Sequence, residues 1–307
     1  MGTSGTPFIA LLEPTALPWE RHSPPDEQPH AASIPRTFID AMKVRTEVFV
    51  QEQQIPQENE FDSDDARCAH WVIYASVNKT VQPAVTDPAT GEILRPRQSE
   101  TQSLPIGTLR LVPFPHAPHP VNGGVYVDEK LVSVSSESST ASTTVATSTA
   151  AATASEVTES KEPAPIPPKP TFAPDRPTAF HDGIEPYVKL GRLAVLREFR
   201  GRGIAAQLVH AALDWIRTHP DYFDPSPTER GFEQLGMEQP GSAAAGVPAT
   251  PPKWNGLVCC HAQEGAVKAW KRCGFQVDEG MGKWFEEGIP HVGMFLRVEV
   301  DRSVKKV

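Results

Sequence analysis

A strand that leads through a glycine-rich turn into an amphipathic helix is the feature that most constrains this chain. Residues 187–195 form an apolar-rich run that predicts a strand, and residues 200–203 spell the turn Arg-Gly-Arg-Gly. Apolar side chains then recur at helical spacing: Ile204, Leu208, Ala211 and Trp215. Such a turn presents backbone N–H groups and a helix N-terminus, which together bind a phosphate or pyrophosphate. The pattern therefore predicts an α/β protein with an anion-binding loop.

Other interpretations of this loop fit less well. A Walker loop would end in Gly-Lys-Ser/Thr, which is not present here. Residues 201–206 match the dinucleotide fingerprint, with Asp221 about 20 residues further on. A Rossmann unit needs a second parallel strand ending in that acid, but residues 218–225 do not read as a strand. The missing strand argues against a NAD-binding oxidoreductase. An ordinary turn without a ligand is also disfavoured, because the loop carries several arginines.

The remaining segments alternate between strand and helix patterns. Strands are expected at 8–12, 70–75, 106–112, 257–260 and 292–300, and helices at 37–55 and 263–273. In the last strand, Val292, Met294 and Leu296 are expected to point inward, with Phe295 and Arg297 outward. The polar residues 78–103 are interpreted as an expanded hairpin loop. Strands separated by single helices indicate α/β or α+β architecture.

Low-complexity sequence interrupts this pattern. Residues 133–160 contain only Ser, Thr, Ala, Val and Glu, a composition that buries too little apolar surface to offset chain entropy. We therefore expect one domain over 35–300, a flexible proline-rich segment at 1–34 and a tail at 301–307. The expected insertions, which are long and disordered, lie at 76–104, 113–186 and 220–255.

Composition narrows the class of function. A formal net charge of −9 argues against a general nucleic-acid binder, which needs basic patches, and suits a cationic ligand better. The four cysteines form no C-x-x-C pairs, so neither structural zinc nor a disulfide framework is expected. No run approaches 18 apolar residues, so we expect a protein without a membrane span. The expected location is the cytoplasm, with the nucleus left open.

The loop sequence Arg-x-x-Gly-x-Ala at 200–205, preceded by Leu-Ala-Val, resembles the coenzyme A loop of the GNAT acetyltransferase superfamily. Residues 44–53 and 191–195 resemble the ElaA-type branch. The Gly-Phe helix exit at 273–275 is similar to that of the superfamily, and residues 286–294 resemble the C-terminal signature of the branch. These blocks follow one another in the expected order and cover somewhat under half of the chain.

The resemblance implies a mixed, mostly antiparallel sheet flanked by helices, and direct transfer of the acetyl group of acetyl-CoA to a primary amine. The expected acceptor is a small cationic amine, and the expected state is a monomer or homodimer. The backbone N–H of Val195 is the implied donor to the thioester oxygen. The residues implied to bind acetyl-CoA are Leu193, Val195, Arg200, Gly201, Arg202, Gly203, Ile204 and Ala205.

Proton transfer needs residues of its own. Glu47, Glu52 and Glu60 lie where the superfamily forms its acceptor pocket, and are the candidates for general base and amine recognition. His291 is the next candidate, and His261 follows it. A nucleophile–base pair of Cys260 with the adjacent His261 is discounted, because neighbouring residues on a strand point to opposite faces.

The residue at the expected position of the general acid departs from the superfamily pattern. Trp270 occupies the place where the superfamily often has a tyrosine that protonates the departing thiolate. Indole is not an ordinary acid, so a catalytically silent acyl-CoA-binding sensor or adaptor remains the alternative to an enzyme. No metal is expected.

Overall fold

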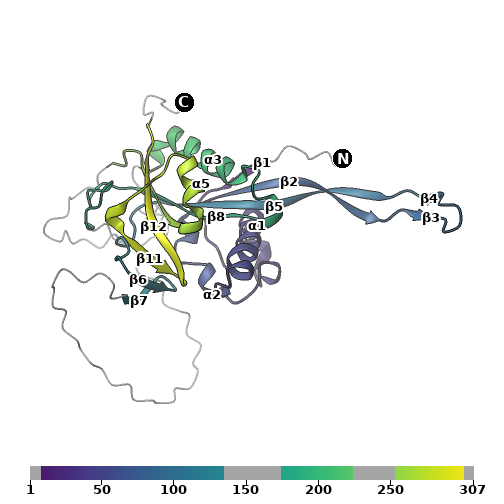
Figure 1. Cartoon of the computed structure of the whole chain (residues 1–307), viewed down its shortest axis with the longest axis horizontal. Helices are drawn as coiled ribbons and strands as arrows, with labels where there is room; N and C mark the ends of the chain where they lie inside the picture. The colour runs from purple at the N-terminus through teal and green to yellow at the C-terminus, as the bar shows by residue number, and fades with distance from the viewer. Residues whose placement is uncertain (1–7, 135–173, 224–252, 301–307) are drawn as a thin grey trace, which may run out of the picture.

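A large, mostly antiparallel sheet dominates the computed structural model, which describes residues 8–134, 174–223 and 253–300 (Figure 1). The strand order is β1-β2-β5-β8-β9-β12-β11-β6-β7, and β10 also pairs with β12. The bounds are β1 Phe8–Leu12, β2 Ala69–Gln82, β5 Gln98–Val112, β6 Gly124–Val127, β7 Lys130–Val134, β8 Val188–Val195, β9 Leu257–Gln263, β10 Gln276–Val277, β11 Lys283–Glu286 and β12 Ile289–Arg297. The expected mixed sheet is confirmed.

Helices cover both faces of this sheet, with α3 above it and α1 below it in the view of Figure 1. One group comprises α1 Arg36–Arg45, the π-helical turn η3 Thr46–Glu52 and α2 Gln57–Glu60. The other comprises α3 Ile204–Thr218 and α5 Val267–Arg272. Shorter 3-10 turns are η1 Pro25–Glu27, η2 Ala31–Ser33, η4 Asp65–Arg67, η5 Arg197–Phe199, η6 Pro220–Phe223, η7 Glu264–Ala266 and η8 Glu279–Met281.

The alternation of β5 explains the two layers. Leu109 and Leu111 belong to the main core, which also contains the apolar stripe of α3. Arg110, between them, points to the other face and meets acidic residues near α1. One face of the sheet centre is therefore apolar, whereas the other carries buried charge.

Two parallel contacts interrupt the antiparallel sheet: β8 with β9, and β6 with β11. The β8–β9 contact is short, since pairing runs only from Val188 opposite Val258 to Leu190 opposite Cys260. Beyond that point β8 continues to Val195 and β9 to Gln263 without pairing to each other. The two strands therefore separate in the middle of the sheet.

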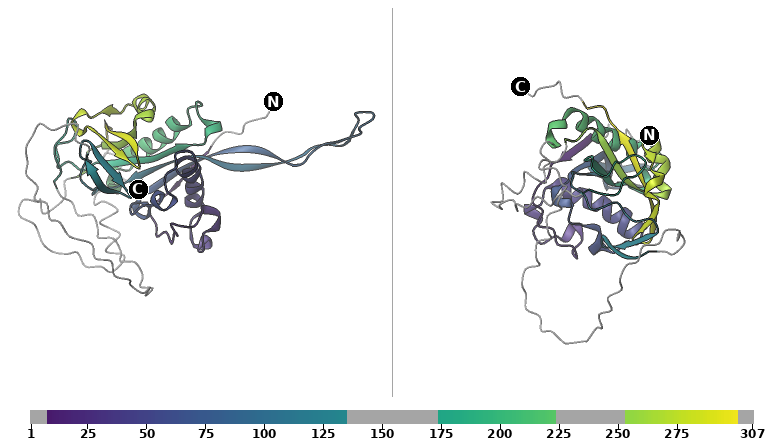
Figure 2. Two further views of the ribbon diagram at one scale, coloured as in Figure 1. Left: turned by 60° about the horizontal axis from the view of Figure 1, so that its bottom comes forward. Right: turned by 90° about the vertical axis from the view of Figure 1, so that its left-hand side faces the viewer.

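Residues 78–103 form the hairpin expected there, but the interpretation of them as a loop was wrong. β2 and β5 continue as a paired ribbon out to Gln82 opposite Gln98, and it projects from the body (Figure 2). Its tip holds β3 Val85–Thr86 and β4 Ile93–Arg95. Backbone pairing extends the strands here, although the outer side chains are exposed and bury no core.

The segment after β5 also differs from the prediction where the structure describes it. Within the expected insertion at 113–186, residues 124–134 form the β6–β7 hairpin, and His119 and His181 are buried against Phe295. Phe295, expected to face outward, is buried because this segment covers the second face of β12. The disorder predicted within 135–173 and 224–252 lies outside the described residues, as does the 301–307 tail.

Both predicted helices are shorter than expected. The first passes from α1 into the π-helical turn η3 and ends before Pro56. In the second, residues up to Gln263 belong to β9, and α5 begins only after η7. Gly274 has a positive φ of 96°, in keeping with its predicted role of closing this helix.

Candidate functional site

A cavity of about 550 Å³ lies where β8 and β9 separate. Residues 190–195 line it from β8, and His261 and Gln263 line it from β9. Val48 and Phe49 from η3 contribute on one side of the sheet, and Trp270 from α5 on the other. The cavity therefore connects the two faces of the sheet through the gap between the strands.

A bulge in β8 shapes one wall of this cavity. The register against β5 shifts between the pair Thr108–Ala194 and the pair Arg110–Gly191, so Arg192 and Leu193 together lie opposite Leu109. Arg192 has a left-handed φ of 48°, an unfavourable conformation for a residue with a side chain. The bulge aims the guanidinium of Arg192 at acidic residues from the α1 side.

The glycine-rich turn between β8 and α3 has the geometry of an anion site. Gly201 and Gly203 have φ values of 73° and 78°, and in the described part of the chain no atom lies within 4 Å of where a Cβ would stand on either. Gly203 is the N-cap of α3 and provides no side-chain oxygen for the first N–H groups of the helix. These donors are therefore free of a side-chain cap, and the space in front of them is open.

Arg200 ties this turn to the cavity wall. Its Nε donates to the carbonyl of Val195 at 2.8 Å, and its terminal nitrogen lies 2.9 Å from Oε2 of Glu52 at the end of η3. The guanidinium of Arg202 stacks over Phe199 at 5.8 Å. Of the predicted acetyl-CoA residues, Leu193, Val195 and Arg200 line the cavity, and the others follow directly in the turn and the first residues of α3.

A buried ion-pair network forms the floor of the site on the α1 side. Arg45, fully buried in α1, donates to Oε1 of Glu60 at 2.6 Å and to both carboxylate oxygens of Asp65 at 2.7 and 3.0 Å. It also donates to the backbone carbonyl of Glu60 at 2.6 Å. The network fixes α2 and the following loop against α1.

The same network reaches the sheet through two further arginines. Arg110 makes a bidentate contact with Asp62 at 2.6 and 2.7 Å, and Arg192 approaches Asp62 at 3.0 Å and Glu60 at 3.2 Å. Burial alone would raise the pKa of Asp65, but the guanidinium groups of Arg45 and Arg110 hold it well below its usual value. Three arginines thus balance Glu60, Asp62 and Asp65.

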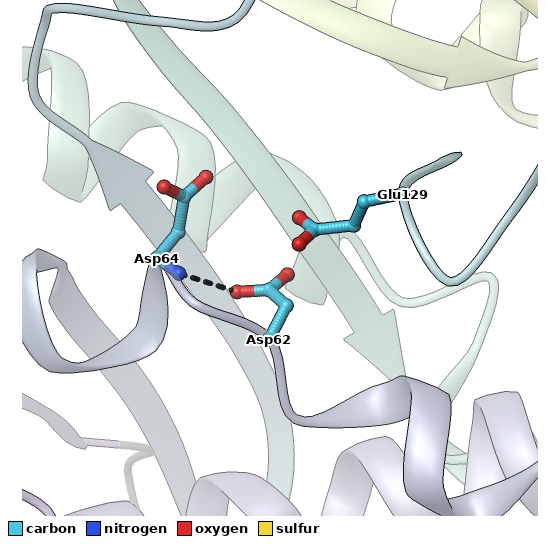
Figure 3. A group of neighbouring side chains, drawn as sticks. All are labelled: Asp62, Asp64 and Glu129. Atoms are coloured by element: carbon cyan, nitrogen blue, oxygen red, sulfur yellow. Dashed lines mark hydrogen bonds between the residues drawn. The ribbon is translucent and has the colours of Figure 1, made fainter. Parts of the chain in front are cut away.

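Asp62, Asp64 and Glu129 form a carboxylate cluster at the rim (Figure 3), with ligand atoms within 4.8 Å of one another. Burial, followed by the neighbouring charges of Asp62 and Asp64, raises the pKa of Glu129. Both oxygens of Asp62 already accept from the guanidinium groups of Arg110 and Arg192.

A second titratable cluster lies on the strands beyond the gap. Oε1 of Glu286 lies 3.0 Å from Nδ1 of His261 and accepts from the indole N–H of Trp284 at 2.7 Å. Its other oxygen lies 3.8 Å from Nε2 of His291, whose Nδ1 is 2.8 Å from the carbonyl of Ile289. His261, Glu286 and His291 all line the cavity.

The structure places the predicted proton-transfer residues in different surroundings. Glu47 is exposed on η3 and does not line the cavity, whereas Glu52 pairs with Arg200. Glu60 lines the cavity but is bound by Arg45 and Arg192, and His291 lines it beside Glu286. Their roles stay predictions.

Sequence reasoning did not single out Glu129, Glu286 or Lys189, which also line the cavity. Glu286 belongs to the quoted C-terminal signature, which was a signal for it. Glu129 lies within the expected insertion, and nothing in the sequence indicates that β6 pairs with β11.

Residues 174–223 match the Acetyltransferase (GNAT) family. The chain contains a GNAT segment. It comprises β8, the glycine-rich turn and α3, so the predicted resemblance to this superfamily is confirmed. No curated protein matches the chain significantly.

Similar solved structures include a proposed N-acetyltransferase from Lactobacillus plantarum, with 19% identity over 95% of this chain and 99% of that one, and a TM-score of 0.38. An acyl-CoA N-acyltransferase from Pseudomonas aeruginosa has 16% identity over 95% and 100% of the two chains, with a TM-score of 0.36. Escherichia coli ElaA has 15% identity over 87% and 94%, with a TM-score of 0.35. In the described part of the chain, no helix is long and apolar enough to cross a membrane.

Proposed function

We propose that this protein is a GNAT N-acetyltransferase that transfers the acetyl group of acetyl-CoA directly to a primary amine, and that the amine is small and cationic. The amine nitrogen would form the amide bond as the carbon–sulfur bond of the thioester breaks. The products are the amide, the CoA thiol and one proton.

The gap between β8 and β9 is the observation that carries this proposal. It opens beside the uncapped start of α3, where a pyrophosphate can bind, and continues to the opposite face of the sheet. Acetyl-CoA and an amine can therefore approach one point from opposite faces. Val195, at the end of β8 on the cavity wall, is the proposed donor to the thioester oxygen.

Charge in the cavity supports a cationic acceptor. Glu60 and Asp62 are neutralised by arginines, but the cavity-lining Glu129, Glu286 and Glu287 have no ion pair with Arg or Lys among the described residues. Lys189, a cation that lines the cavity, has no ion pair with Asp or Glu among the described residues. The acceptor side thus has an excess of negative charge, which attracts a cation.

The proposal is tested by thiol release from acetyl-CoA with a panel of primary amines, alongside calorimetric titration with CoA. Turnover should occur with mono- and dicationic amines and should be weaker with amino acids, whose carboxylate is repelled. Binding of CoA without turnover of any amine would contradict the proposal. That result would favour an acyl-CoA-binding sensor. Trp270, which stands where a tyrosine acid is expected, is the sequence feature that supports this alternative.

A further inference from the structure

His261 occupies the point at which the two central strands separate. Cys260 forms the last β9 pair with Leu190 of β8, and His261 is the next residue along β9. Its side chain lines the cavity and is 18% exposed, whereas Cys260 is fully buried in the main core. The alternation of the strand thus turns His261, and not its neighbour, toward the passage that connects the two faces.

Glu286 fixes the orientation of the His261 ring. Its Oε1 is held by two donors, Nδ1 of His261 at 3.0 Å and the indole N–H of Trp284 at 2.7 Å. The Trp284 ring also packs edge-on against the imidazole, with centroids 4.9 Å apart. Because β11 pairs with β12 next to β9, this support comes from regular sheet and not from a loop.

This arrangement decides the tautomer. Hydrogen bonds from His261 and Trp284 favour the ionised form of Glu286 and hold its pKa below the usual value against the effect of burial. An ionised carboxylate only accepts, so Nδ1 of His261 carries the proton and Nε2 of the neutral ring has a free lone pair. Among the described residues, that Nε2 has no hydrogen-bond partner.

We propose that Nε2 of His261 is the base that removes a proton from the ammonium group of the acceptor, and that Glu286 is the residue that positions it. This inference rests on the proposed function. One ammonium N–H bond breaks, the proton bonds to Nε2, and it then passes to bulk water through the cavity. The neutral amine so formed has the lone pair needed for attack on the thioester.

The free energy at stake is substantial. A primary amine with a pKa near 10.4 is only about 0.04% unprotonated at pH 7, which corresponds to about 4.6 kcal/mol. A positioned base typically contributes a factor of about 10² to 10⁴ in rate. The carboxylates of Glu52 and Glu60 are bound by guanidinium groups, whereas Nε2 of His261 has no hydrogen-bond partner among the residues that the structure describes.

Burial and the surrounding charges together lower the pKa of His261. Burial lowers its pKa, the hydrogen bond and charge of Glu286 on β11 oppose this, and Lys189 on β8 and His291 on β12 lower it further. His116 and His119, in the segment after β5, are the other titratable groups that interact with it. The acid limb of the rate profile is therefore expected below the ordinary histidine pKa of about 6.5.

The test is the pH dependence of thiol release with the best amine of the panel, for the parent, His261→Gln, Glu286→Gln and His291→Gln. His261→Gln should lower kcat by about 100-fold or more and remove the acid limb, with unchanged affinity for CoA. Glu286→Gln retains an oxygen that can accept from Nδ1 but loses its charge. It should move the acid limb to lower pH, which a purely structural role would not do.

His30→Gln is the matched control, since His30 is exposed and does not line the cavity, and it should leave the profile unchanged. An unchanged profile for His261→Gln, or loss of the acid limb in His291→Gln alone, overturns the assignment of the base while the proposed function stands. A parent that binds CoA but acetylates no amine overturns the proposed function and this inference with it. If His261→Gln does not fold, the Glu286→Gln variant tests the assignment instead. An acid limb at lower pH supports His261 as the base, and an unmoved acid limb overturns it.

Discussion

Glycine at position 203 combines a local conformational requirement with a proposed binding role. Its φ of 78° lies in the left-handed region, and among the described residues no atom lies within 4 Å of where a Cβ would stand. The proposed occupant of that space is the pyrophosphate of CoA. A side chain there would block the ligand without colliding with the fold.

Gly203→Val is therefore expected to abolish CoA binding in calorimetry while leaving a folded protein that is less stable by about 1–2 kcal/mol, the cost of a left-handed β-carbon. Gly91→Val is the matched control, because Gly91 has a φ of 72° and an equally open Cβ position but lies at the tip of the ribbon. It should lose similar stability and retain CoA affinity. Normal affinity in Gly203→Val would refute the assignment of this loop.

Replacing Arg45 measures how much the buried ion pairs contribute to the free energy of unfolding. Arg45→Met leaves Glu60 and Asp65 buried without their main partner, which typically costs about 3–5 kcal/mol at pH 7. The folded pKa of Asp65 is depressed in the parent, so its contribution is present above the unfolded pKa of about 3.9 and is lost as pH falls toward the folded value. The stability gap between parent and variant should therefore narrow on acidification.

Urea unfolding at pH 7 and at stepwise lower pH measures this gap. Arg36→Met on the same helix is the control, because the Arg36 side chain is 74% exposed in its pair with Asp40 and should cost less than about 1 kcal/mol. A gap for Arg45→Met as small as that of the control, or one that widens toward acid, would contradict the role given to the network.

At the level of elements, the outer part of the β2–β5 ribbon is paired strand whose side chains are exposed and do not contribute to a core. Replacing residues 79–100 by Asn-Gly joins Asn78 to Thr101, which already pair, through a two-residue hairpin turn. Because the removed side chains are exposed, the melting temperature should change by less than about 4 °C, or about 1 kcal/mol. Ile73→Ala, in the buried half of β2, should cost about 2–5 kcal/mol.

Thermal unfolding followed by circular dichroism checks both variants. A truncated protein that melts as early as Ile73→Ala would show that the ribbon stabilises the body.

Pairing between distant strands also builds the site. The β8–β9 gap, the bulge at Arg192 and the β6–β11 contact are each made by strands that are distant in sequence.

At the scale of the whole molecule, the sheet separates an apolar layer beside α3 and α5 from a layer beside α1, η3 and α2 that contains both apolar clusters and the buried ion pairs. The proposed ligands meet where the sheet opens between these layers. The described part of the expected insertion at 113–186 adds β6 and covers Phe295, so it contributes both a strand and part of the acceptor side.

The sequence alone determined the strand, the glycine-rich turn and the helix that follows, because apolar periodicity and the backbone freedom of glycine are local properties. It also predicted the mixed sheet. Only the tertiary structure decided which acids are neutralised: Glu60 is a candidate base in the sequence, yet Arg45 from α1 and Arg192 from β8 bind its carboxylate. Likewise, the pairing of His261 with Glu286 depends on strand register, which residue types do not encode locally.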